Sequence, residues 1–219
     1  MSRNFAPLLL LLLIAGPPLA SSDGPVLTGD TGWQHLEDKD GVTLYSRTRV
    51  GAGFREFKGT GVIDMPPATV EKVLEDISAY PTFMPYVAEA RVLSQDGDDL
   101  LTYQRLDVPL IADRDYTVKF QHGIAKDAAG AIIYRDTWQT ANEAGPAAKL
   151  GTVRVKVNEG SWLLEPMGPD GATTQATYQI YTDSGGVLPA FLANKASQLI
   201  IPRLFDGVRK QAHDPKYQR

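Results

Sequence analysis

From residue 42 to residue 182 the chain alternates short segments of strand character with turn-forming residues. The strand-like segments are residues 42–50, 54–64, 91–94, 100–108, 115–122, 131–140, 152–158, 161–166 and 172–182. Each segment is bounded by Gly, Pro, Asp or Asn, and polar turn sequences connect several neighbours. Because strands joined by short hairpins pair antiparallel, this pattern predicts one antiparallel sheet.

The chain ends in a long segment with helical periodicity, residues 188–212. Its apolar stripe consists of Leu188, Phe191, Leu192, Ala196, Leu199, Ile200, Leu204 and Val208. Pro202 lies inside the segment, so we expect a kink or a break there. A helix with a long apolar stripe needs a partner surface, and the concave face of an antiparallel sheet supplies one. The predicted fold class is therefore α+β, with the sheet wrapped around the C-terminal helix.

Two shorter segments also have helical character. Residues 33–38 are expected to form a short helix, and residues 66–76 a longer one. In the longer segment a proline suits the first turn, and apolar residues recur at helical spacing. Between these two segments, residues 42–50 and 54–64 are expected to pair as an antiparallel hairpin.

The N-terminus has the layout of a secretory signal peptide. Arg3 precedes an unbroken apolar run over residues 8–15, and prolines and small residues follow it. The run is shorter than the about 20 residues that a membrane span needs. We therefore expect residues 1–22 to be a cleaved signal peptide and residues 23–32 a flexible lead-in. The expected location is the periplasm or the extracellular space, and an uncleaved N-terminal anchor is the alternative.

Composition and motif spacing exclude several classes of protein. The 219 residues carry a formal net charge of −4, which gives no electrostatic footprint for nucleic acid. The chain has no cysteine, which excludes disulfides, thiolate metal ligands and a cysteine nucleophile. His35, His122 and His213 are scattered, and neither Gly-x-Ser-x-Gly nor His-Glu-x-x-His occurs. We therefore expect a monomer with no catalytic residue, metal or cofactor.

Three motifs follow one another along the chain. They are Ala112-Asp113-Arg114-Asp115-Tyr116 at a strand entrance, Gly160-Ser161-Trp162 within a strand, and Asp183-Ser184-Gly185-Gly186-Val187-Leu188-Pro189 before the terminal helix. In this order they resemble the START domain, the StAR-related lipid-transfer family, in an exported, single-domain form of bacterial type. The resemblance covers residues 33–213. It implies a helix-grip fold whose internal apolar cavity binds one lipid or another hydrophobic molecule, with a role in carrying it between membranes.

The same scaffold is similar to that of polyketide cyclases and aromatase-cyclases, whose cavity acids, arginines and tyrosines act as acid–base groups. An enzyme of that kind is the alternative function, although few His and Glu residues are predicted to face the cavity. A lipid-sensing accessory protein is a third alternative.

Side chains alternate between the two faces of a strand, which selects candidates for the cavity wall. The predicted ligand-binding residues are Met84, Tyr103, Arg105, Tyr116, Val118, Trp138, Trp162, Tyr178, Phe191, Leu192, Lys195 and Leu199. The aromatic and aliphatic members are expected to hold the tail of the ligand, and Arg105 or Lys195 its head group. A core filled by these side chains is the alternative.

Arg114 is expected to be structural, paired with the acids Asp113 and Asp115 that flank it. Sterol-carrying START domains place an acid and an arginine inside the cavity. The position of that arginine aligns here with Phe120, which argues against a sterol ligand. The loop at residues 109–112 is expected to open for lipid entry, and its apolar residues Leu110 and Ile111 to contact a membrane surface. Ordinary loop packing is the alternative.

Overall fold

The alternation of strands and turns produces a single sheet. The computed structural model describes residues 32–49, 53–187 and 189–218, so the predicted signal peptide and nearly all of the lead-in lie outside the described residues. In the described part of the chain the sheet has eleven strands. They are β1 (Gln34–Lys39), β2 (Val42–Thr48), β3 (Arg55–Ile63), β4 (Val87–Asp96), β5 (Asp99–Leu106), β6 (Asp113–Gln121), β7 (Ile124–Lys126), β8 (Ile132–Thr140), β9 (Thr152–Arg154), β10 (Val157–Met167) and β11 (Thr173–Asp183).

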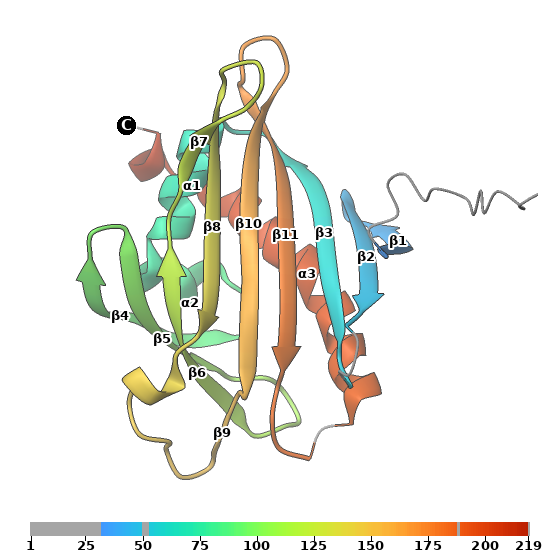
Figure 1. Cartoon of the computed structure of the whole chain (residues 1–219), viewed down its shortest axis with the longest axis vertical. Helices are drawn as coiled ribbons and strands as arrows, with labels where there is room; N and C mark the ends of the chain where they lie inside the picture. The colour runs from blue at the N-terminus through green and yellow to red at the C-terminus, as the bar shows by residue number, and fades with distance from the viewer. Residues whose placement is uncertain (1–31, 50–52, 188, 219) are drawn as a thin grey trace, which may run out of the picture. The chain divides into compact units, whose positions relative to one another are not determined.

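The strands follow the order β1-β2-β3-β11-β10-β8-β6-β5-β4, with β7 paired to β8 and β9 paired to β6. Short connections join antiparallel neighbours along most of this path, and the predicted hairpin of β2 and β3 is confirmed. Pairing of β3 with β11 places strands that are far apart in the sequence side by side (Figure 1). The antiparallel sheet and the α+β class predicted from the sequence are therefore confirmed.

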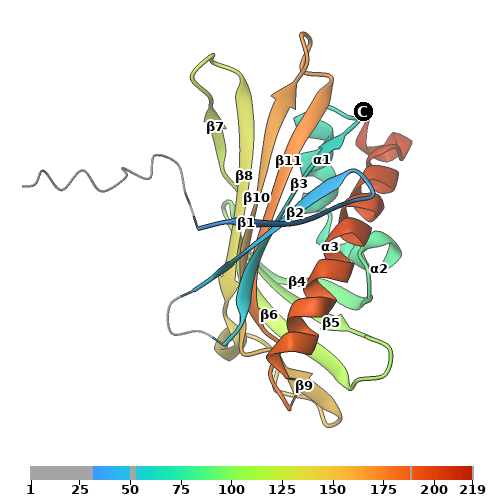
Figure 2. The same ribbon diagram turned by 90° about the vertical axis from the view of Figure 1, so that its right-hand side faces the viewer.

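The helices are α1 (Pro67–Glu75), α2 (Tyr80–Phe83) and α3 (Ala190–Ala212), with 3-10 turns at Ile77–Ala79, Asn142–Ala144 and Pro215–Tyr217. Figure 2 shows all three helices on the same side of the curved sheet. Gly59 of β3 allows α3 to approach closely, because a Cβ there would lie 2.6 Å from Ile201 Cγ2. Within the described ranges, no helix has the length and apolar character needed to cross a membrane.

The dry core lies where α1 and the C-terminal half of α3 meet the sheet. Val73 and Leu74 of α1 and Phe205 and Val208 of α3 are fully buried there, against strand residues such as Leu44. Burial of such side chains stabilises the fold by roughly 1.5–3 kcal/mol each. The N-terminal half of α3 is less buried, since Ala193 is the one residue before Ile201 that is buried among those described. The helix therefore fills one end of the sheet and leaves space under the other.

The structure corrects three local predictions. The predicted helix at residues 33–38 is instead the edge strand β1, which gains its backbone hydrogen bonds by pairing with β2. The predicted strand at residues 152–158 is divided between β9, which is parallel to β6, and the start of β10. The predicted break at Pro202 is absent, since α3 runs through this buried residue. Ile201 and Phe205, on either side of Pro202 in the sequence, both pack against Gly59 of β3.

Candidate ligand-binding cavity

A cavity of about 240 Å³ lies between the sheet and the N-terminal half of α3. Its wall comes from α2 and the connection to β4, from strands β4, β5, β6, β8, β10 and β11, and from α3. The strand residues in the wall are Val87, Gln104, Leu106, Arg114, Tyr116, Val118, Phe120, Trp138, Asn158, Trp162, Tyr178, Ile180 and Thr182. Successive wall residues in β6 and β11 are two positions apart, as expected for side chains on one face of a strand.

Aromatic rings form the deep end of the cavity. Phe120 stacks on Trp138 with ring centroids 5.7 Å apart, and Trp138 stacks on Tyr178 at 5.8 Å. Trp162 contacts Tyr178 at 4.8 Å and also Phe205 of the dry core at 5.3 Å. We call Phe120, Trp138, Trp162 and Tyr178 the aromatic floor. These rings supply a large, rigid apolar surface for a hydrophobic ligand.

The side of the cavity formed by α3 is lined by small and aliphatic residues. They are Ala193, Ala196, Ser197, Ile200, Ile201 and Leu204. Small side chains near the start of the helix leave room between it and the strands, whereas Ile201 closes the space toward the core. The wall is therefore continuous from the aromatic floor to the loops that precede α3.

The cavity brings together six of the twelve residues predicted to bind a ligand. Met84, Tyr116, Val118, Trp138, Trp162 and Tyr178 all line it. That they hold a ligand stays a prediction, but the strand alternation used to choose them selected the correct face in β6, β8, β10 and β11.

The prediction that Tyr103 and Arg105 line the cavity is wrong. In β5 the cavity-facing residues are Gln104 and Leu106, so Tyr103 and Arg105, which alternate with them, point to the opposite face. There Tyr103 donates a hydrogen bond to Asp115 Oδ2 at 3.2 Å, and Arg105 donates to Asp113 Oδ2 at 2.6 Å. Alternation separates the two faces of a strand but does not say which face points into the cavity. The prediction took the face of β5 with the larger side chains, Tyr103 and Arg105, as the inner face, and the structure shows that it is the outer one.

The prediction is also wrong for Phe191, Leu192, Lys195 and Leu199 of α3. These residues are exposed and do not line the cavity, with 69% of the Phe191 surface accessible to solvent. The predicted stripe is therefore divided between two faces of the helix. Its members Ala196, Ile200 and Leu204 line the cavity, whereas Phe191, Leu192 and Leu199 point to solvent. Periodicity identified the helix correctly, but both faces of its N-terminal half carry apolar side chains.

Neutral polar groups in the wall are mostly paired with one another. The Tyr116 hydroxyl donates to Gln104 Oε1 at 2.9 Å, and Trp138 Nε1 donates to Asn158 Oδ1 at 2.9 Å. Burial raises the pKa of both Tyr116 and Tyr178, which keeps these phenols neutral. The middle of the cavity is thus apolar, and these two polar pairs lie at its edge.

Arg114 differs from the structural role predicted for it. Its guanidinium faces the cavity, and the residue is 6% exposed. The flanking acids point to the other face of β6, where Asp113 pairs with Arg105 and Asp115 pairs with Arg154 at 2.7 Å. The same alternation that selected Tyr116 and Val118 also places Arg114 inside, so the sequence did contain the signal.

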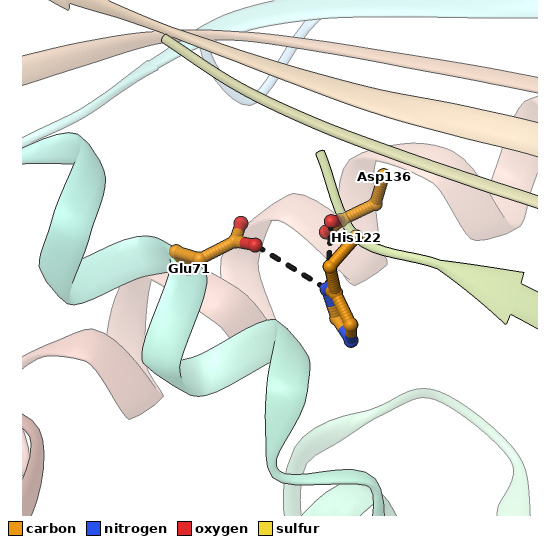
Figure 3. A group of neighbouring side chains, drawn as sticks. All are labelled: Glu71, His122 and Asp136. Carbon is orange, nitrogen blue, oxygen red and sulfur yellow. Dashed lines mark hydrogen bonds and ion pairs between the residues drawn. The ribbon is translucent and has the colours of Figure 1, made fainter. Parts of the chain in front are cut away.

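A second group of buried polar side chains lies outside the cavity wall (Figure 3). His122 Nδ1 is 2.9 Å from Asp136 Oδ1 and 3.3 Å from Glu71 Oε1. This cluster joins α1 to the strands. Burial lowers the pKa of His122, but the hydrogen bonds with Asp136 and Glu71 outweigh that effect and raise it to about 10. Burial raises the pKa of Glu71 to about 7.

Glu71, His122 and Asp136 each offer one ligand atom, and these atoms lie within 4.8 Å of one another, as a metal site would require. In the structure, Nδ1 of His122 lies within ion-pair distance of both carboxylates, so a protonated imidazole pairs with them directly. Sequence spacing did not reveal this cluster, because its members come from separate parts of the chain. The three residues form an ion-pair network between α1 and the sheet.

A family model described as polyketide cyclase / dehydrase and lipid transport matches residues 63–209. The chain belongs to this family. An uncharacterized protein of Pseudomonas aeruginosa is 30% identical over 163 residues, covering 74% of this chain and 77% of that protein.

Two solved structures resemble the fold. A STAR-related lipid transfer protein of Xanthomonas axonopodis is 25% identical, with a TM-score of 0.72 over 84% of this chain and 99% of that one. The Zhui aromatase/cyclase of a Streptomyces species is 18% identical, with a TM-score of 0.50 over 72% and 93% of the two chains. The START resemblance and the helix-grip fold predicted from the sequence are therefore confirmed.

Proposed function

We propose that this protein binds one lipid, or another hydrophobic small molecule, in the cavity and carries it between membranes. The observation that carries the proposal is the apolar cavity between the sheet and α3, closed at its deep end by the aromatic floor. Membership of a family that includes lipid-transport proteins supports it. Apolar burial alone supplies the affinity, at roughly 0.8 kcal/mol for each methylene removed from water.

The residues near the cavity opening fit contact with a membrane surface. Ile111 and Ser184 line the cavity, and the neighbouring Leu110 and Val187 are fully exposed apolar residues. Leu110 also has a φ of 71°, a strained conformation for a residue with a side chain. Apolar side chains at this position would enter the lipid headgroup region and bring the opening to the membrane.

The wall composition favours a carrier over an enzyme. In the described part of the chain the cavity wall contains no carboxylate and no imidazole. Glu71, His122 and Asp136 lie outside the wall and are engaged with one another. A cyclase of the aromatase type needs groups that move protons on a bound substrate. The wall does contain Arg114 and tyrosines, but burial raises the pKa of Tyr116 and Tyr178, which makes these phenols poor proton donors. We further propose that the carrier is exported and acts as a monomer, as its N-terminal sequence and composition indicate.

The proposal is tested by native mass spectrometry of the protein purified from its own host, followed by transfer of labelled lipid between vesicles. We expect one co-purified lipid per chain and transfer that depends on protein concentration. Empty protein that takes up no lipid from vesicles would contradict the proposal. Turnover of an aromatic polyketide substrate would favour the enzyme alternative instead.

A further inference from the structure

Arg114 is a buried cation that makes no ion pair with any described acid. Among the described residues it is the one charged side chain in the cavity wall. Its Nη1 donates to the carbonyl oxygen of Ala112, while its Nε is buried and has no hydrogen-bond partner in the described part of the chain. Burying an unpaired charge is costly, and a buried arginine is ordinarily matched by a carboxylate or a phosphate. The missing partner points to a ligand.

The protein's own acids are not available to Arg114. Asp113 and Asp115, its neighbours in sequence, lie on the opposite face of β6 and are held by Arg105 and Arg154. Asp115 also accepts a hydrogen bond from Tyr103. To reach Arg114, either carboxylate would have to leave an arginine and turn through the plane of the sheet. The arrangement therefore keeps the acids away from the cavity and the arginine within it.

The surroundings of Arg114 give the cavity a polar end. Arg114 is the register partner of Val153 in β9, and Val153 is also the neighbour of Gly185, directly after Ser184. Ser184 lines the cavity too, and its hydroxyl is buried without a partner. Two unsatisfied polar groups thus lie at the end of the cavity near the loop at residues 107–112. The aromatic floor lies deeper, along β6 from Arg114 to Phe120.

We propose that Arg114 binds the anionic head group, a carboxylate or a phosphate, of a single-chain lipid whose tail lies on the aromatic floor. The inference rests on the proposed lipid-binding function and adds the ligand class. A guanidinium presents paired N–H donors that match two oxygens of either anion. At about 240 Å³ the cavity is below the usual range of about 300–1,000 Å³ for ligand pockets, which favours one acyl chain over two.

The test compares three ligands with the same 16-carbon chain: hexadecanoate, a lysophosphatidic acid and hexadecanol. Binding to the wild-type protein is measured by isothermal titration calorimetry, with native mass spectrometry for stoichiometry. We expect at least one of the two anions to bind roughly tenfold or more tightly than the alcohol, because a charged hydrogen bond replaces a neutral one. The stronger of the two anions identifies a free fatty acid or a phosphate-bearing lipid as the source.

Variants then assign the preference to Arg114. Arg114→Gln should reduce anion affinity to the level of hexadecanol, and Arg114→Lys should retain part of the preference. Arg105→Gln is the matched control, since Arg105 is on the outer face of the sheet, and it should keep the full preference. Without ligand, Arg114→Gln should be at least as thermally stable as the wild type, because it removes an unpaired buried charge.

The outcomes separate this inference from the proposed function. If hexadecanol binds as tightly as both anions, the role of Arg114 is overturned while hydrophobic binding stands. If none of the three ligands binds while native mass spectrometry still shows a co-purified lipid, the single-chain anion is overturned and the proposed function stands. If no lipid co-purifies and none is taken up from vesicles, the proposed function itself fails. Loss of stability in Arg114→Gln, with an unchanged ratio of anion to alcohol affinity, would show that Arg114 is structural. The wild-type ratio decides the ligand class even if a variant does not fold.

Discussion

Gly160 lies directly against the indole of Trp138: a Cβ built on Gly160 would come within 2.3 Å of Trp138 Cζ2 and within 2.4 Å of the backbone oxygen of Gln179. The two residues face each other in the pairing of β10 with β8. The absence of a side chain at Gly160 allows the Trp138 ring to lie flat across the strand, where it stacks on Phe120 and Tyr178. Both ends of the Gly160-Ser161-Trp162 motif thus contribute to the aromatic floor: Gly160 leaves room for the Trp138 ring, and Trp162 is itself part of the floor.

Gly160→Ala should therefore displace Trp138 and destabilise the protein by about 1–3 kcal/mol, the usual cost of overpacking. Thermal unfolding and tryptophan fluorescence measure the two effects. Gly53→Ala is the control, because a Cβ at Gly53 meets no described atom within 4 Å. Equal unfolding temperatures for the two variants would contradict the close packing of Gly160 on Trp138.

The Glu71–His122–Asp136 cluster predicts how stability depends on pH. Glu71 and His122 both hold a proton more tightly in the folded state, since their pKa values rise from 4.5 to about 7 and from 6.5 to about 10. The folded state therefore binds more protons than the unfolded state between pH 4.5 and about 7 at Glu71, and between pH 6.5 and about 10 at His122. The free energy of unfolding should therefore fall as pH rises from about 4.5 to 7 through Glu71, and from about 6.5 to 10 through His122.

Glu71→Gln removes the first of these contributions. Between pH 5 and pH 8 we expect the wild type to lose on the order of 1–3 kcal/mol, and the variant clearly less. Urea unfolding at several pH values measures the difference. Glu75→Gln, an exposed position on the same helix, should keep the wild-type slope. Stability that is flat or rises with pH in the wild type would contradict the assignment.

Arg209 connects the C-terminal end of α3 to the sheet through hydrogen bonds to backbone carbonyls. Its Nε donates to the carbonyl oxygen of Val62 at 2.9 Å, and its two terminal nitrogens donate to those of Asp40 and Gly41 at 2.8 Å. A lysine does not reproduce this fork of donors. Arg209→Lys should cost about 1–3 kcal/mol in the free energy of unfolding.

The neighbouring Lys210 supplies the control for Arg209. It makes an exposed ion pair with Asp206, and Lys210→Ala should change stability by less than about 1 kcal/mol. Chemical denaturation of both variants gives the comparison. If Lys210→Ala lowers the free energy of unfolding more than Arg209→Lys does, the hydrogen bonds of Arg209 to backbone carbonyls do not hold the helix in place.

Membrane contact at the cavity opening is tested by Val187→Asp. Val187 is fully exposed, so the fold should tolerate the change, while entry of a charge into the headgroup region is unfavourable. We expect slower lipid transfer between vesicles with unchanged affinity for a soluble ligand. Ile124→Asp alters an exposed apolar residue of β7 and should leave transfer unaffected. Equal slowing by both variants would point to a general loss of apolar surface.

The sequence predicts the architecture well because strand alternation, turns and one long amphipathic segment act locally. It also predicts the cavity wall where apolar and polar positions alternate clearly, as for Tyr116 and Val118 of β6. It fails for Tyr103 of β5 and Phe191 of α3, because both faces of these elements carry large side chains and the choice depends on packing elsewhere.

Residues brought together by the fold are harder to predict. Glu71 lies in a helix, His122 directly after the end of β6, and Asp136 in the middle of β8, so no spacing in the sequence connects them. Arg114 was assigned to the acids beside it in the sequence, yet neighbours along a strand point to opposite faces. Alternation along β6 puts Arg114 on the same face as Tyr116 and Val118, and the structure identifies that face as the inner one.

The central claim is that the space beneath the N-terminal half of α3 holds the lipid. Its most direct test is the number of lipid molecules bound per chain, measured by native mass spectrometry, in Ala196→Trp and Lys195→Trp. Ala196 lines the cavity, whereas Lys195 is exposed on the same helix. The account predicts one lipid on the wild type and on Lys195→Trp, and none on a folded Ala196→Trp protein. The wild-type number of bound lipids on Ala196→Trp would contradict it.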